Sequence, residues 1–293
     1  MIPILENFIH LSRKLNVLIV GETIVDEFVP VLYEGQSMKS FCPVFRLTDG
    51  EKQIQQGGTA AIANHLRDFV GNIKVITNSN NEITKTRYVD VNNGQKHIEI
   101  NKFDTKGFAP ISVKTEDYDL VIVADFGHGF CDKLDINDGF CLMTQTNSNN
   151  FGFNRVSKWK GKRKKSVCID LREASLQMNQ KIKNPDYNNI KSLYDYELDA
   201  ENLFVTTGKE GALFFDGSQY IEQKTFQTQV VDTIGAGDAF FGFSCLLATL
   251  KNDLNLDKSL FIPALAASLT TTWLCNEKNV TPTSLKEHAS RYL

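Results

Sequence analysis

The sequence predicts an α/β protein with a Rossmann-like, doubly wound, mostly parallel sheet and a small β lid. Three observations predict this fold. From residue 119 onward, short apolar runs alternate with helical segments. Polar, acidic and glycine residues follow these runs, as expected where parallel strands gather a ligand site at their carboxyl ends. Two clusters of strand-like residues, at about 28–56 and 84–104, interrupt the pattern and predict a lid inserted into a single domain, residues 1–293.

Composition narrows the class of protein. The chain has 293 residues, 42% of them apolar, which is enough for a large core. A net charge of −3 argues against a nucleic-acid partner bound by bulk electrostatics, and no apolar run is long enough to cross a membrane. The first residues form a short helix pattern and lack the apolar core of a signal peptide. Six scattered cysteines without a CxxC pair favour reduced thiols and a cytoplasmic protein.

The first predicted strand, Asn16 to Val20, is apolar and stops at Gly21. Asp26 follows shortly after, and its carboxylate could accept hydrogen bonds from sugar hydroxyls. Taken alone, these residues favour a plainer interpretation in which Glu22 and Asp26 are turn and surface acids.

The lid clusters alternate apolar and polar residues without a helical period, and Asn92-Asn93-Gly94 predicts a hairpin in the second one. The outer face of such a lid needs cover, which a second subunit often supplies, so we expect a homodimer. Between the clusters, Gly57 and Gly58 precede a helix rich in small residues. They suit close approach of a polyhydroxylated ligand, and equally tight packing of the helix.

Later strands end in polar, acidic and glycine residues. One ends at Asp125, and another ends at Asp170, with Glu173 three residues further on. The strand Leu203 to Thr206 ends in a glycine turn, residues 207–211, that could admit a nucleotide. The basic run at 158–165 could attract anions, but a solvated connector is the simpler interpretation.

The segment from Asp232 to Asp238 reads Asp-Thr-Ile-Gly-Ala-Gly-Asp and opens an apolar helix. Glycine lets backbone N–H groups approach an anion, and the helix start adds unpaired donors. Asp238 could then take the proton of an attacking hydroxyl during phosphoryl transfer. The alternative is a structural glycine turn with Asp238 as helix cap.

Other kinase motifs are missing from the sequence. It has no GxxxxGK[ST] loop, which excludes a P-loop enzyme, and no protein-kinase HRD or DFG motif. It also lacks HxGH, so a nucleotidylyltransferase of that type is not encoded. A magnesium ion bound mainly through water and phosphate oxygens could be held by Asp170 and Glu173.

The string from Asp232 to Asp238 resembles the C-terminal motif of the PfkB/ribokinase family of carbohydrate kinases. The chain is most similar to the heptose-7-phosphate kinase branch, the kinase half of ADP-heptose synthases, at residues 17–26, 42–44, 84–88 and 125–129. The resemblance implies a ribokinase-like fold, ATP and Mg²⁺, and a lid that often dimerises. It also implies the following site residues: Asp238 as base; Gly235, Ala236 and Gly237 as anion hole; Asp26, Gly57, Gly58, Asn64 and Asp125 toward the sugar; Thr207, Gly208, Gly211, Asp232 and Thr233 toward the nucleotide; and Asp170 and Glu173, at the family's Asn-x-x-Glu position, toward magnesium.

Three features differ from that branch. Ala61 stands at its usual sugar-binding Asn, His128 stands at its usual Lys, and the chain between Ile76 and Ile83 is shorter. Two hypotheses of different class therefore remain: a kinase for a sugar or sugar phosphate, with a heptose-phosphate-like substrate favoured, and a catalytically degenerate binding or scaffold protein on the same fold. Specificity for another small alcohol is also open, because it is set by lid and pocket shape.

Overall fold

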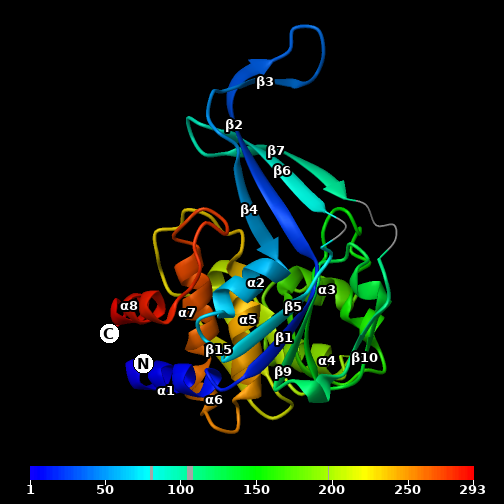
Figure 1. Ribbon diagram of the computed structural model, residues 1–293, viewed down its shortest axis with the longest axis vertical. Helices are drawn as coiled ribbons and strands as arrows, with labels where there is room; N and C mark the ends of the chain where they lie inside the picture. Colours follow the sequence, from blue (N-terminus) through cyan, green and yellow to red (C-terminus); the bar gives the residue numbers. More distant parts are fainter. Residues whose placement is uncertain (80–81, 104–107, 197) are drawn as a thin grey trace.

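The protein is built on an eight-stranded sheet from which a five-stranded lid projects (Figure 1). This computed structural model describes residues 1–79, 82–103, 108–196 and 198–293. The strand order is β15-β14-β13-β12-β11-β9-β1-β5, and pairing is parallel from β13 to β5 and antiparallel at β14 and β15. The mostly parallel α/β sheet predicted from the sequence is confirmed. Its strands are β1 (Asn16–Gly21), β5 (Asn72–Ile76), β9 (Leu120–Asp125), β11 (Phe140–Thr144), β12 (Lys164–Asp170), β13 (Leu203–Thr206), β14 (Ala212–Phe215) and β15 (Tyr220–Gln223).

The central strands are apolar at consecutive positions because both faces of the sheet are covered. In β1, Val17 and Ile19 enter one core, while Leu18 and Val20 enter the other. This is the alternation that a pleated strand imposes. Both faces of the sheet are therefore covered, and in sheets of this kind ligands bind where the parallel strands end.

Helices cover both faces unequally. Six pack into the first core, and two short helices pack into the second, together with the small strands β8 (Ile111–Val113) and β10 (Leu134–Ile136). No helix of the described residues is long and apolar enough to cross a membrane. The first group is α1 (Ile2–Ser12), α2 (Thr59–Leu66), α5 (Ala236–Thr249), α6 (Leu256–Ser259), α7 (Phe261–Thr270) and α8 (Pro282–Ser290); the second is α3 (Leu171–Gln177) and α4 (Tyr187–Asp195).

The lid stands above the carboxyl ends of the core strands (Figure 1). Its longest strand, β2, pairs with β4 and then β3 along one side and with β6 along the other, and β6 pairs with β7. Residue 104, the predicted end of the second lid segment, lies outside the described residues. The lid strands are β2 (Thr23–Gln36), β3 (Pro43–Leu47), β4 (Gln53–Gly58), β6 (Ile83–Asp90) and β7 (Lys96–Phe103).

Strand β2 begins at Thr23, and only Glu22 separates it from the end of β1. Asp26 therefore lies within a strand, on the same face as Ile24 and Phe28, and all three are buried. Glu22 is also fully buried, and accepts hydrogen bonds from the backbone N–H groups of residues 126, 128 and 130. The interpretation of Glu22 and Asp26 as turn and surface acids is thus wrong.

The basic run was also misinterpreted in part. Lys158 forms ion pairs with Asp125 and Asp132. Lys164 is fully buried, and its ammonium group donates to the carbonyl oxygens of Trp159 and Leu198. The segment is therefore not a simple solvated connector, because Lys158 and Lys164 bind protein groups from other segments of the chain.

Candidate active site

A cavity of about 280 Å³ lies between the lid and the carboxyl ends of the core strands. We call it the lid cavity. Three segments far apart in sequence meet there: the inner face of the lid, the ends of β9 and β11, and the start of α5. Its lining residues are Ile24, Asp26, Gly58, Lys85, Arg87, Phe126, Gln145, Thr233, Ile234, Gly235, Gly237, Asp238 and Asn276.

The start of α5 supplies backbone donors to the lid cavity. Gly235 is the N-cap residue, with a left-handed φ of 88° that favours glycine. The N–H of Ile234 donates to Asp232, and that of Ala236 lies 3.4 Å from the Thr233 carbonyl oxygen. Within the described residues, the N–H groups of Gly235 and Gly237 have no such partner. A β-carbon at Gly237 would meet nothing within 4 Å, so the position is open for an anion.

Asp238 lies in the first turn of α5 and is half-buried. Burial, and then the negative charge of Asp26, raise the pKa of Asp238 to about 7, against the effects of Lys85 and a backbone hydrogen bond from Gly58. A carboxyl group with this pKa is partly ionised near neutral pH and can accept a proton there. The geometry thus places a potential base beside open N–H donors.

Asp26 forms a buried ion pair with Arg87 of β6. Both side chains are less than a tenth exposed, and Arg87 Nε also donates to Glu99 at 2.9 Å. Desolvation raises the pKa of Asp26, and the charge of Arg87 opposes that rise. Asp26 therefore faces the lid cavity as a carboxylate whose position is fixed by a lid residue.

The glycine pair permits close approach of backbone segments. Gly58 has a φ of 62°, and a β-carbon there would overlap the Glu22 carbonyl oxygen. A β-carbon at Gly57 would overlap the Asp26 carboxylate and come within 3.2 Å of Asn276 Nδ2. Gly58 lines the lid cavity, whereas the missing side chain of Gly57 leaves the space that the Asp26 carboxylate occupies. Both glycines thus permit close packing of protein groups, and ligand approach at Gly58 stays a prediction.

Asp232 holds the loop before α5 in place. It is buried and accepts from Lys96 Nζ at 2.7 Å, from Ile234 N and from Cys275 N. Its oxygens are thus occupied by protein donors, while the neighbouring Thr233 lines the lid cavity. Asp232 connects the lid strand β7 to the start of α5.

Asp170 and Glu173 form the capping box of α3. Glu173 accepts from the backbone N–H of Asp170 and of Thr146, both at 2.8 Å. Burial, and then the charge of Asp170, raise the pKa of Glu173 to about 8. Direct metal ligation by Glu173 would cost these hydrogen bonds, whereas exposed Asp170 has one carboxylate oxygen without a protein partner among the described residues. The pair fits a magnesium ion held through water better than one bound directly.

Thr207, Gly208 and Gly211 form the turn after β13, away from the lid cavity. Gly208 and Gly211 have φ angles of 64° and 117°.

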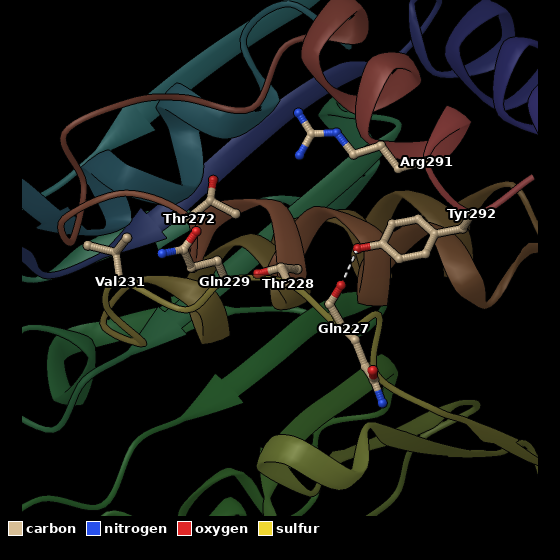
Figure 2. A pocket seen from close by; sticks show the side chains of 7 residues that line it. All are labelled: Gln227, Thr228, Gln229, Val231, Thr272, Arg291 and Tyr292. Carbon is tan, nitrogen blue, oxygen red and sulfur yellow. Dashed lines mark hydrogen bonds between the residues drawn. The ribbon is translucent and has the colours of Figure 1, made fainter.

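A second hollow, of about 550 Å³, is lined in part by residues that directly precede Asp232, and we call it the C-terminal pocket. Figure 2 shows the Tyr292 hydroxyl directed at the Gln227 carbonyl oxygen, 2.7 Å away. The lining residues are Gln227, Thr228, Gln229, Val231, Thr272, Arg291 and Tyr292.

Two predicted sugar ligands do not reach the lid cavity. Asn64 lines a separate hollow on the other side of β2 and accepts from Arg67. Asp125 is fully buried and bonded to Trp159, Asn154 and Lys158. Their side chains are committed to the protein interior or to another surface.

Four polar or charged lining residues were not identified from the sequence as site residues. Lys85 and Arg87 could have been found, because they alternate on one face of a predicted strand. Gln145 and Asn276 carry no such signal. Asn276 lines the lid cavity from the segment before α8.

The variant Arg87→Met tests the buried pair. We expect it to lower the free energy of unfolding by about 3–5 kcal/mol at pH 8, because it leaves Asp26 buried and unpaired. The loss should be smaller at pH 5, since a carboxyl group with a raised pKa in the folded state takes up a proton as the pH falls and stabilises that state. Urea unfolding at both pH values measures this.

The double variant Asp26→Asn/Arg87→Met is the control, because it removes both charges and should lose the pH dependence. Equal destabilisation of Arg87→Met at pH 5 and pH 8 would contradict the assignment.

Comparison with known proteins agrees with this geometry. Residues 166–274 match the model of the pfkB family carbohydrate kinases. The bifunctional protein HldE of Aliarcobacter butzleri is 23% identical over 300 residues, covering 88% of this chain and 61% of that protein. Alignments with the curated relatives span between 14% and 61% of their lengths.

Solved structures share the fold. The Thermotoga maritima ribokinase has a TM-score of 0.65 at 13% identity, with 94% of this chain and 99% of that chain covered. The Arabidopsis thaliana ribokinase, complexed with ribose and ATP, has a TM-score of 0.62 at 14% identity, with 94% and 98% covered. Residues 166–274 of this chain thus resemble the pfkB family of carbohydrate kinases, and the chain shares the fold of the solved ribokinases.

Proposed function

We propose that the protein transfers the γ-phosphoryl group of ATP to a hydroxyl group of a sugar or sugar phosphate, with Asp238 as general base. The observation that carries this proposal is the placement of Asp238, whose pKa is raised to about 7, beside the open N–H groups of Gly235 and Gly237 in one cavity. Phosphoryl transfer needs positioning, neutralisation of negative charge and a proton acceptor. The lid cavity offers each of them.

The chemistry follows from these groups. Asp238 accepts the proton of the attacking hydroxyl, and the N–H groups of Gly235 and Gly237 donate to oxygens of the transferring group. Asp232 keeps these donors in place through its bonds to Ile234 and Cys275. Magnesium would add charge neutralisation at the nucleotide phosphates, with Asp170 and Glu173 holding its water shell.

The nucleotide is assigned to the side of α5 that faces the C-terminal pocket and the turn at residues 207–211. The C-terminal pocket supports this, because it lies along the chain immediately before Asp232 and Thr233. The solved ribokinase complex with ribose and ATP shows that the shared fold holds both ligands in that protein.

A heptose-phosphate-like substrate is favoured within this class. The support is the resemblance of residues 84–88 and 125–129 to heptose-7-phosphate kinases and the similarity to HldE over 88% of the chain. We also propose a homodimer formed through the lid.

Asp238→Asn tests the base. We expect turnover to fall by about 10²- to 10⁴-fold while the Michaelis constant for the sugar changes little, because the amide cannot accept the proton. In the unmodified protein, kcat/KM should decrease as the pH falls below about 7 and Asp238 becomes protonated. A coupled ATP-consumption assay over a sugar panel measures both.

The exposed Asp253→Asn is the control and should keep full turnover. Full activity of Asp238→Asn would exclude this residue as base. Ligand binding by the unmodified protein without turnover on any sugar would instead favour the degenerate binding protein.

Gly237→Ala tests the anion site. The added methyl group meets no atom of another part of the chain within 4 Å, so the melting temperature should stay unchanged. Turnover should fall at least about tenfold, because the methyl group occupies the space that a phosphoryl oxygen needs.

Gly242→Ala, in the same helix, is the matched contrast. Its β-carbon would come within 3.3 Å of Ile62 and Leu66 in the core. It should therefore affect stability and leave the anion site intact. Unchanged turnover of Gly237→Ala would argue against an anion at this position.

Light scattering tests the proposed dimer. Strand register places Ile54 and Ile100 on the outer lid face, where they are 60% and 53% exposed. If this face covers its counterpart in a second subunit, the double variant Ile54→Glu/Ile100→Glu should be monomeric at concentrations where the unmodified protein is dimeric. A monomeric mass for the unmodified protein at high concentration would contradict the proposal.

A further inference from the structure

We propose that Lys96 is a positioning residue for phosphoryl transfer. From the lid, its ammonium group holds the segment from Asp232 to Gly237, which we call the anion loop, so that the backbone donors of this loop keep their direction only while the lid is in place. This inference rests on the proposed function and adds to it a residue that acts through Asp232.

Lys96 reaches from the lid to the core. It is the first residue of β7 and follows the hairpin that joins β6 to β7. Its ammonium nitrogen lies 2.7 Å from Asp232 Oδ2 and 5.9 Å from the centre of the Phe28 ring. The Lys96 side chain is 25% exposed, whereas that of Asp232 is only 6% exposed. An ion pair with a buried carboxylate therefore joins the lid to the anion loop.

Asp232 also binds the backbone near the start of α5. Its Oδ1 accepts from the N–H of Ile234 and its Oδ2 from that of Cys275, both at 3.2 Å. Ile234 directly precedes Gly235, the N-cap of α5. Within the part of the chain that the structure describes, Lys96 is the one cation within 4.0 Å of Asp232. The carboxylate that fixes the Ile234 N–H thus depends on a lid residue for its counter-charge.

A second contact from the lid supports the same loop. The Asn276 N–H donates to Gln55 Oε1 of β4 at 2.7 Å. A β-carbon at Gly235 would lie 2.5 Å from Asn276 Oδ1, so these two residues are closely packed. The lid therefore supports the anion loop from two strands, through Lys96 on β7 and through Gln55 on β4. Of these two contacts, only that of Lys96 carries charge.

Loss of the Lys96 charge should displace the anion loop. A buried carboxylate without a counter-charge is unfavourable, and the loop relieves it by turning Asp232 toward solvent. The Ile234 N–H then loses its acceptor, and the N–H groups of Gly235 and Gly237 shift relative to the lid cavity. Catalysis by positioned donors is sensitive to displacements of about 1 Å. Lys96 thus acts on the rate of transfer without contact to the reacting atoms.

Steady-state kinetics of Lys96→Met test the inference in a coupled ATP-consumption assay. We expect kcat to fall about 10- to 100-fold while KM for the sugar changes less than about threefold, because the displaced donors serve the transferring group. Lys96→Arg should keep part of the rate, since it keeps the charge. The matched control is Lys52→Met, which removes an ion pair with Glu27 inside the lid and should keep full turnover.

Chemical rescue separates the missing charge from a general defect. Lys96→Ala leaves space beside Asp232 that ethylammonium can enter, and this cation should restore turnover up to about tenfold through a charge-assisted hydrogen bond. Tetramethylammonium at the same ionic strength has no N–H donor and should restore nothing.

Amide hydrogen exchange of the ligand-free protein provides a measurement that does not depend on turnover. Lys96→Met should speed exchange in peptides that cover residues 231–238 and leave those of β9 unchanged. Lys52→Met should change neither.

Two outcomes would overturn the inference. One is full kcat in Lys96→Met. The other is faster exchange throughout the sheet together with no recovery by ethylammonium, which would make Lys96 a residue of general stability. Faster exchange confined to residues 231–238, in a protein without turnover on any sugar, would uphold the control of the anion loop by Lys96 and contradict only the kinase function.

Discussion

The buried ion pair between Asp26 and Arg87 is the interaction on which the rest of the site depends. A carboxylate at this depth requires a partner, and Arg87 of the lid strand β6 supplies it. The Asp26 carboxylate excludes a side chain at Gly57, and its charge raises the pKa of Asp238. Arg87 is also paired with Glu99. The position of the lid and the pKa of Asp238 are therefore coupled through one ion pair.

A second buried carboxylate shapes the floor of the cavity. Glu22 follows β1 directly and accepts three backbone N–H groups from the loop after β9. Burial, and then the charge of Asp125, raise the pKa of Glu22 to about 7. Lys158 compensates Asp125 from a third segment. The loop that carries Phe126 into the lid cavity is thus fixed by carboxylates that lie outside the cavity lining, and an acidic residue at a strand end can serve structure as well as catalysis.

The sequence predicted the fold class because continuous apolar runs, strand-end glycines and the alternating pattern of the lid strands are local signals. It also predicted which loop carries Asp238, since the motif is contiguous. It could not predict that Asn64 faces a different hollow, because one turn of α2 decides the direction of its side chain. Nor could it predict that Lys164, within a basic run, is buried. Its ammonium group donates hydrogen bonds to the carbonyl oxygens of Trp159 and Leu198 in place of water. Lys85 was within reach of strand alternation, but choosing its face required the register with Asp26.

The lid places two requirements on the same residues. Along β6, side chains on the inner face of the lid alternate with side chains on its outer face. Lys85 and Arg87 lie on the inner face, and Thr84, Thr86 and Tyr88 lie on the outer face. A one-residue slip between β2 and β6 would turn Lys85 and Arg87 outward and leave Asp26 without its partner. The register of the lid is therefore held by the buried ion pair of Asp26 and Arg87. The backbone donors at the start of α5 do not depend on this alternation, because a helix presents unpaired N–H groups at its N-terminus. The lid still acts on this end of the cavity, since Lys96 holds Asp232 and the charge of Asp26 raises the pKa of Asp238.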